Sequence, residues 1–120
     1  MKRMKMLSAL MLVVMMAAAL AGCGAVTDGA KAYTIATDAA FPPMEFVDES
    51  KAIVGFDIDL MNAIAKEAGF TVEWKNTAWD GIFAGLESGA YDAVMSAVTI
   101  TDERKEKYNF SDPYINAGQA

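Results

Sequence analysis

Residues 33–37 form an alternating run rich in residues that favour β-structure, and this pattern predicts a strand. Residues 38–51 follow and contain the adjacent prolines Pro42 and Pro43. Proline is excluded from helix interiors and from central strands. We therefore expect a strand and then a loop at the start of the patterned region.

A helical period follows at residues 57–68, where apolar and polar side chains fall on opposite faces. The apolar face holds Leu60, Met61, Ile64, Ala65 and Ala68, and the polar face holds Asp59, Asn62 and Lys66. Gly69 stands where helices often end in a left-handed glycine. We expect an amphipathic helix, with Asp57 and Asp59 as first-turn acids on different faces rather than a cooperating carboxylate pair.

The next segments predict a strand, a second helix and a third strand. Phe70, Val72 and Trp74 alternate with polar residues, as in a half-buried outer strand. The second helix is indicated by the helical spacing of Trp79, Ile82, Phe83 and Leu86, with Gly89 at its end. Residues 92–98 predict a more buried strand, and residues 101–103 open a short helix that carries Lys105 and Lys107 in its later turn.

The order strand, helix, strand, helix, strand predicts an α/β fold, a parallel sheet with flanking helices and right-handed crossovers. Ligands of such sheets bind beyond the carboxyl ends of the strands, where the winding direction reverses. If the first strand lies in the middle, that crevice is lined by residues 38–41 and 96–101. Periodicity alone does not fix the position of the first strand.

Residues 1–22 differ from the rest and predict a signal peptide. Lys2, Arg3 and Lys5 precede an uncharged run at residues 6–21, which is too short for a typical spanning helix. The run ends at Cys23, and residues 20–23 (LAGC) match the lipobox of bacterial lipoproteins, so we expect a lipid on Cys23 and a flexible tether over residues 23–32. The alternatives are an ordinary secretory signal with an incidental cysteine, or a retained hydrophobic anchor.

Composition excludes several classes of function. Three of the ten basic residues lie in the leader, so the remainder carries seven basic and sixteen acidic side chains, a net charge of −9 that disfavours nucleic acid as a partner. The chain has no histidine and one cysteine, which excludes histidine-dependent nucleophilic catalysis, histidine-ligated metal sites and an internal disulfide. We expect no cofactor and no bound metal.

The segment from Ser96 to Arg104 follows the third strand and opens the short helix, so it offers backbone N–H groups, hydroxyls and a guanidinium in one place. This combination suits a carboxylate ligand, because arginine binds both carboxylate oxygens at once. In the alternative interpretation, Thr101 only caps the helix and Arg104 pairs with Glu103 or another surface acid.

Three further residues are candidates for a binding pocket. Phe41 and Phe56 stand beside the loop breakers Pro42 and Gly55, where aromatic pocket walls often arise, although each also fits an ordinary core position. Asp38 follows the first strand, where it could accept a hydrogen bond from a ligand ammonium group or cap a turn.

Four segments together resemble the polar amino-acid binding proteins of bacterial uptake ABC transporters. They are residues 37–46 (TDAAFPPMEF), 55–60 (GFDIDL), 99–104 (TITDER) and 110–114 (FSDPY). The resemblance implies a periplasmic-binding-protein-like fold of two lobes that close on a free amino acid, which is then delivered to a membrane permease. It also implies that residues 33–113 are a partial first lobe, and that residues 114–120 begin the crossover to a second lobe that this sequence lacks.

The resemblance also implies roles for the candidate residues. Arg104 would bind the α-carboxylate of the ligand, helped by Thr99 and by the main chain of Ala97. Phe41 and Phe56 would sandwich the ligand side chain. Asp38 would hold its polar end, and Ser96 is a further candidate of the same rim. Without the second lobe, we expect much weaker affinity than in a complete relative.

Two other classes of function stay open from the sequence. Dehydratases and lytic transglycosylases resemble this scaffold, but the sequence shows no histidine and no acid pair at a credible spacing, so we do not expect an enzyme. A sensor module of a receptor is the other alternative. We expect an exported protein, lipid-anchored at the outer face of the cytoplasmic membrane or in the periplasm, whose amino-acid specificity the sequence does not reveal.

Overall fold

The computed structural model describes residues 29–116 of the chain. The strands are β1 (Ala32–Thr37), β2 (Ala40–Phe41), β3 (Glu45–Val47), β4 (Ile53–Val54), β5 (Thr71–Asn76) and β6 (Ala93–Val94). The helices are α2 (Phe56–Ala68), α3 (Trp79–Glu87) and α4 (Asp102–Lys105). The predicted signal peptide, Cys23 and most of the tether lie outside the described residues.

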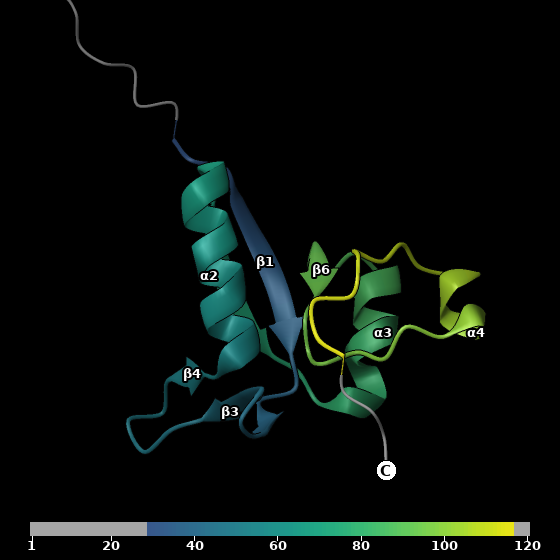
Figure 1. Cartoon of the computed structure of the whole chain (residues 1–120), viewed down its shortest axis with the longest axis horizontal. Helices are drawn as coiled ribbons and strands as arrows, with labels where there is room; N and C mark the ends of the chain where they lie inside the picture. The colour runs from purple at the N-terminus through teal and green to yellow at the C-terminus, as the bar shows by residue number, and fades with distance from the viewer. Residues whose placement is uncertain (1–28, 117–120) are drawn as a thin grey trace, which may run out of the picture.

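The main sheet has the strand order β5-β1-β6, and both pairings of β1 are parallel. The first strand therefore lies in the middle, and β5 lies at an edge of the described sheet, as its half-buried pattern predicted. Figure 1 shows α2 and α3 on opposite sides of β1. The predicted α/β fold with a parallel sheet and flanking helices is confirmed.

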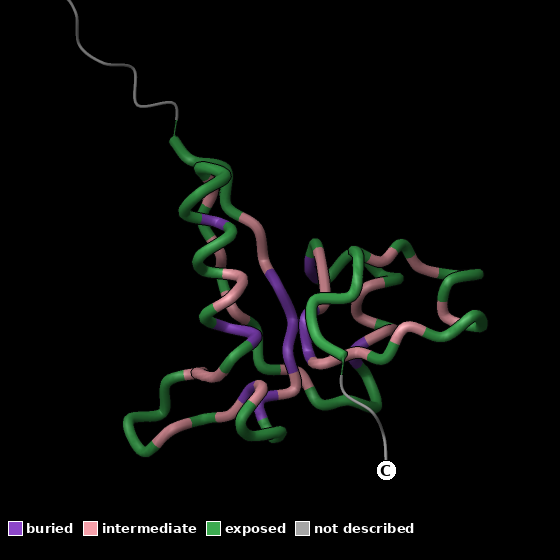
Figure 2. The backbone as a smooth tube through the Cα atoms, viewed as in Figure 1, coloured by how far each residue is buried: buried purple, intermediate pink, exposed green. Residues whose placement is uncertain are grey.

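The core is built on both faces of β1, whose last three residues are buried (Figure 2). On one face, Ala36 packs in a buried cluster with Ile82 of α3 and with Tyr91, whose hydroxyl donates a hydrogen bond to the Ile82 carbonyl. On the other face lies Ile35, because successive strand residues point to opposite sides. Helix α3 is thus fixed against β1, the strand that leads to the predicted crevice, while α2 packs on β5.

The predicted helix ends agree closely with the structure. Gly69 has a left-handed conformation with φ 79°, and its N–H donates to the Ala65 carbonyl. Helix α3 ends at Glu87, two residues before Gly89, which has φ 73°. The Thr101 side chain accepts a hydrogen bond from the backbone N–H of Arg104 and caps α4.

Two predictions were wrong in extent. Residues 38–51 are not simply a loop, because β2, β3 and β4 form a small antiparallel sheet with the order β2-β3-β4. The two prolines occupy the turn between β2 and β3.

The strand expected over residues 92–98 is only two residues long, since β6 consists of Ala93 and Val94. Beyond it, Ala97 adopts φ 45°, which is incompatible with an extended strand.

The small sheet is joined to the start of α2 through the main chain. The first two helical N–H groups, of Phe56 and Asp57, donate to the carbonyls of Pro43 and Met44 at 3.0 and 2.9 Å. Gly55 has φ 133°, and a Cβ atom built there would lie 2.3 Å from the Met44 carbonyl oxygen. Glycine is therefore required here, and the close approach carries Asp57 into the interior.

Within residues 29–116, no helix has the length and apolar character that crossing a membrane requires.

Candidate functional site

An open cavity of about 630 Å³ lies at the carboxyl ends of β1 and β6, where the order of the sheet predicted a crevice. Its lining consists of Asp38, Ala40, Phe41, Glu45, Trp79, Ser96, Ala97, Thr99, Thr101, Glu103 and Arg104. These residues come from the segments after β1, β5 and β6, from the start of β3 and from α4. Residues far apart in the sequence thus face one space.

All the predicted ligand-binding residues except Phe56 line this cavity. The Phe56 ring is 44 % exposed and stacks against Tyr114, with 6.3 Å between the ring centroids. The expected sandwich of Phe41 and Phe56 is therefore absent from the lining. Phe41 is 60 % exposed at the cavity, so it is not an ordinary core residue.

The guanidinium of Arg104 is held by uncharged partners. Its Nη1 donates to the Thr99 carbonyl at 2.9 Å, and its Cζ lies 5.6 and 5.3 Å from the ring centroids of Trp79 and Phe83. Both distances are within the range of cation–π attraction. Two aromatic faces and a carbonyl therefore fix the direction of the side chain.

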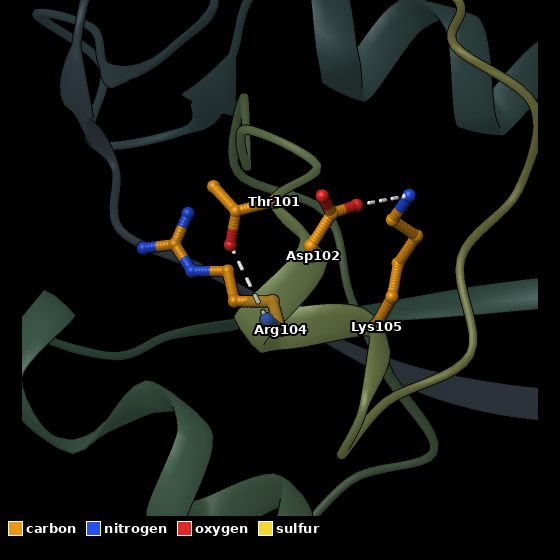
Figure 3. Close-up of polar contacts among 4 residues, drawn as sticks. All are labelled: Thr101, Asp102, Arg104 and Lys105. Carbon is orange, nitrogen blue, oxygen red and sulfur yellow. Dashed lines mark hydrogen bonds and ion pairs between the residues drawn. The ribbon is translucent and has the colours of Figure 1, made fainter.

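No carboxylate pairs with Arg104 in the described part of the chain. The ion pair found there joins Lys105 to Asp102 at 2.7 Å. Figure 3 shows the Arg104 side chain on the Thr101 side of α4, away from that pair. The predicted alternative of an Arg104–Glu103 pair is not observed, and the cavity keeps a guanidinium whose charge is not neutralised by a neighbouring acid.

Asp38 both lines the cavity and caps a helix. Its Oδ2 accepts a hydrogen bond from the backbone N–H of Trp79, the first residue of α3, at 3.1 Å. Its own N–H donates to the Ser96 hydroxyl at 3.0 Å. The residue that caps α3, Ala78, has no side-chain acceptor, so Asp38 supplies one from the segment that follows β1.

The backbone N–H of Ala97 is not available to a ligand in this arrangement. It donates to Oδ2 of Asp57 at 2.7 Å. The help that we expected from this N–H in carboxylate binding is therefore not supported by the geometry. The contribution of Thr99 also differs in part, because its carbonyl accepts from Arg104.

Trp79 and Glu45 line the cavity but were not among the predicted site residues. Trp79 was assigned to the apolar face of its helix, yet it is 38 % exposed and touches the cavity. It follows β5, so the strand-end rule that selected Asp38 and Ser96 could have selected it too. The sequence feature that could have identified Glu45 is a single acid between the apolar residues Met44 and Phe46.

Glu45 is buried, with 1 % of its surface exposed, and its Oε1 accepts a hydrogen bond from the Ser96 hydroxyl at 2.8 Å. Burial raises the pKa of Glu45 from 4.5 to about 7, against the opposing effect of the Ser96 hydrogen bond. The charge of Asp57 raises this pKa further. The carboxyl group is therefore half protonated near neutral pH.

Asp57 lies in the first turn of α2, as we expected, and its side chain is fully buried. Its Oδ2 accepts hydrogen bonds from the Ala97 N–H and from the Tyr114 hydroxyl at 3.0 Å. Together with Glu45 it forms an acid pair that the sequence did not reveal, because residues 12 positions apart meet only through the Gly55 turn. Among residues 29–116, no group of three or more acids or cysteines is arranged to hold a metal ion.

The cavity combines a guanidinium, nearby acids and two exposed aromatic rings. This set is complementary to a small zwitterion, because the carboxylate can meet Arg104 while the ammonium group meets Asp38. Aromatic faces from Phe41 and Trp79 can cover an apolar or planar side chain.

Comparison with known proteins agrees with this geometry. A protein called "Probable histidine-binding protein" from Neisseria gonorrhoeae is 48 % identical over 89 residues, which cover 74 % of this chain and 33 % of the relative. The ancestral amino acid-binding protein AncCDT-1, described as a precursor of cyclohexadienyl dehydratase, is 50 % identical with a TM-score of 0.67 over 72 % of this chain and 39 % of that one. The arginine-bound form of domain 1 from TmArgBP is 42 % identical with a TM-score of 0.69 over 72 % and 69 %.

All three of these proteins are named as binding proteins or as part of one, and the chain spans about a third of the length of the first curated relative. The family described as bacterial extracellular solute-binding proteins, family 3, matches residues 33–120. That match covers the main sheet apart from Ala32, and every residue that lines the cavity. The chain therefore belongs to the bacterial extracellular solute-binding proteins, family 3.

Proposed function

We propose that the cavity binds a free amino acid and that Arg104 binds its α-carboxylate. The observation that carries this proposal is the Arg104 guanidinium, which lines an open cavity and has no carboxylate within ion-pair distance in residues 29–116. Its position is fixed by Thr99 and by two aromatic rings, so little side-chain freedom is lost on binding. A charge-assisted, two-pronged contact with a carboxylate then becomes favourable.

The remaining lining residues have complementary roles in this proposal. Asp38 accepts a hydrogen bond from the ammonium group or from a polar side chain of the ligand. Phe41 and Trp79 form the aromatic walls, so Trp79 takes the place that we had expected for Phe56. The hydroxyls of Ser96 and Thr99 complete the rim.

We propose a basic amino acid as the ligand. Besides Glu45, which is half protonated near neutral pH, the cavity carries two acids, Asp38 and Glu103, against one guanidinium, so a ligand with an extra positive charge is attracted to it. The names of two relatives, one histidine-binding and one arginine-bound, support the same class.

For the whole protein, we propose the role of a substrate-binding component that delivers the amino acid to an ABC transporter permease, without catalysis. The binding-protein names of the relatives support this role. The description of AncCDT-1 as a precursor of a dehydratase favours one second candidate, an enzyme on this scaffold. An assay of ligand turnover separates the two, since the binding role predicts that the amino acid is recovered unchanged.

We also propose that Cys23 carries a lipid that anchors the exported protein to a membrane. The sequence at residues 20–23 supports this proposal, and the family description places its members outside the cell. Growth of producing cells with a radioactive fatty acid tests it. We expect label in the wild-type protein and none after Cys23→Ala, and label that persists in the variant would contradict the proposal.

Replacing Arg104 tests the carboxylate site. In Arg104→Met the aliphatic stem is kept and the guanidinium is lost, so we expect the dissociation constant for arginine or histidine to rise about 10- to 100-fold, the effect of losing a hydrogen bond to a charged group. The measurement is an NMR or calorimetric titration of the 120-residue chain, carried to millimolar ligand.

Lys105→Met is the matched control, because it removes a cation from the same helix, on the side that faces away from the Arg104 side chain and at a residue that does not line the cavity. We expect this variant to bind within a factor of two of the wild type. An equal loss of ligand affinity in the two variants would show that α4 acts only through its net charge. The assignment of Arg104 to the carboxylate site would then be wrong.

A further inference from the structure

Glu45 lines the cavity and Asp57 lies behind it. Each acid uses one carboxyl oxygen for a hydrogen bond with Ser96 or Ala97, the two residues that form the rim of the cavity after β6. Oε1 of Glu45 accepts from the Ser96 hydroxyl, and Oδ2 of Asp57 accepts from the Ala97 N–H. The Ser96 hydroxyl in turn accepts from the backbone N–H of Asp38. Both acids are completely or almost completely buried, with 1 % and 0 % of their surfaces exposed.

The other two oxygens define the chemistry of the pair. Oε2 of Glu45 and Oδ1 of Asp57 are buried, and neither has a hydrogen-bond donor in the described residues. No lysine or arginine pairs with either acid in residues 29–116. Two ionised carboxylates in this position would leave two buried acceptors unsatisfied and two like charges adjacent, which is strongly unfavourable. A proton on the pair removes one of these charges, and the effect of Asp57 on the pKa of Glu45 indicates that the two carboxyl groups lie close enough to interact.

We propose that Glu45 and Asp57 share a single proton and act together as positioning residues that hold the Ser96–Ala97 rim of the amino-acid site. The Gly55 turn brings the two acids together, so β3, α2 and the segment after β6 are joined at one point. This inference rests on the proposed function for its effect on ligand binding, whereas the shared proton stands on the geometry alone.

The charges around the pair determine the direction of the pH effect. Two titratable groups act on the acid pair, Asp38 from the end of β1 and Tyr114 from the C-terminal segment. Glu103 and Arg104 line the same cavity from α4. Burial and the charge of Asp57 raise the pKa of Tyr114, so its hydroxyl stays protonated and continues to donate to Asp57. Loss of the shared proton at higher pH therefore adds a charge that only the distant Arg104 opposes. The rim loosens and ligand binding weakens as the pH rises through about 7.

Glu45→Gln tests the shared proton, since its amide can donate to Asp57 and its carbonyl can accept from Ser96 at every pH. In the wild-type chain we expect the dissociation constant for arginine, whose charge is constant over this range, to rise up to about tenfold between pH 6 and pH 8, the change in the protonated fraction of a group that titrates near 7. In Glu45→Gln we expect this ratio to fall below two. The same rise in the variant would overturn the proposal.

A second measurement does not depend on the ligand. Carbon NMR of the free chain follows the Glu45 carboxyl, and proton–nitrogen NMR follows the Ala97 and Asp38 amides. We expect all three signals to titrate together near neutral pH, and the two amide titrations to disappear in Glu45→Gln. A Glu45 carboxyl that titrates at its ordinary pKa, or rim amides that do not follow it, would overturn the proposal. If no amino acid binds at either pH, the proposed function fails, and this titration still decides whether the pair exists.

Discussion

Glu45 couples the stability of the folded chain to pH. Burial raises its pKa to about 7 in the folded chain, whereas the unfolded chain releases the same proton near 4.5. Between these values the folded state binds more protons than the unfolded state, so the contribution of this group is fully present below pH 4.5 and is lost as the pH rises to about 7. The loss is on the order of 3 kcal/mol.

Urea unfolding of the wild type and of Glu45→Gln at several pH values checks this prediction. We expect the wild type to lose stability relative to Glu45→Gln between pH 4.5 and 7, and the difference to stay level above that range. Glu49→Gln, at an exposed position of the same β3–β4 hairpin, is the control and should show no such trend. A difference that grows in the opposite direction would mean that Glu45 is ionised in the folded chain.

At the scale of single residues, the sequence identified those that chain order places at strand ends. Asp38 directly follows β1 and Arg104 lies in the segment after β6, so the rule for parallel sheets was sufficient to bring them to one cavity. Phe56 failed because its position beside Gly55 showed only that it starts a helix, not which way its ring points. Trp79 was missed because its helical spacing also fitted the core.

At the scale of elements, strong periodicity predicted α2, α3, β1 and β5 well. The short strands β2, β3 and β4 were not predicted, because two- or three-residue strands carry too little alternation to be recognised and depend on pairing with one another. The length of β6 was overestimated, because the apolar pattern continues beyond the end of the strand. Residues up to Val98 are apolar enough for a strand, but the contact between Ala97 and Asp57, distant in the sequence, bends the chain.

The Gly55 turn is the element-scale feature that organises the site. At this turn, carbonyl groups between β2 and β3 accept hydrogen bonds from the first N–H groups of α2. These hydrogen bonds place Asp57 near Glu45 and near the Ser96–Ala97 rim. A long-range packing constraint of this kind is invisible to local pattern analysis. It explains why the acid pair was found only in the structure.

At the scale of the whole molecule, the described residues form an open cavity, and this part of the chain also carries several exposed aromatic residues. Phe41, Phe56 and Tyr114 are exposed, and Ile115 follows them at the C-terminal end of the described residues. Because one side of the cavity is open to solvent, water competes for Arg104, and we expect the 120-residue chain to bind more weakly than a complete relative.

The most direct test of the carboxylate site compares each basic amino acid with the amine that lacks its carboxylate. Arginine is paired with agmatine and histidine with histamine, in NMR titrations of the full chain and of Arg104→Met. We predict that at least one amino acid binds ten times more tightly than its amine, and that this ratio approaches one in Arg104→Met. Equal binding of amino acid and amine by the wild type, or a ratio that survives the loss of the guanidinium, would contradict the assignment.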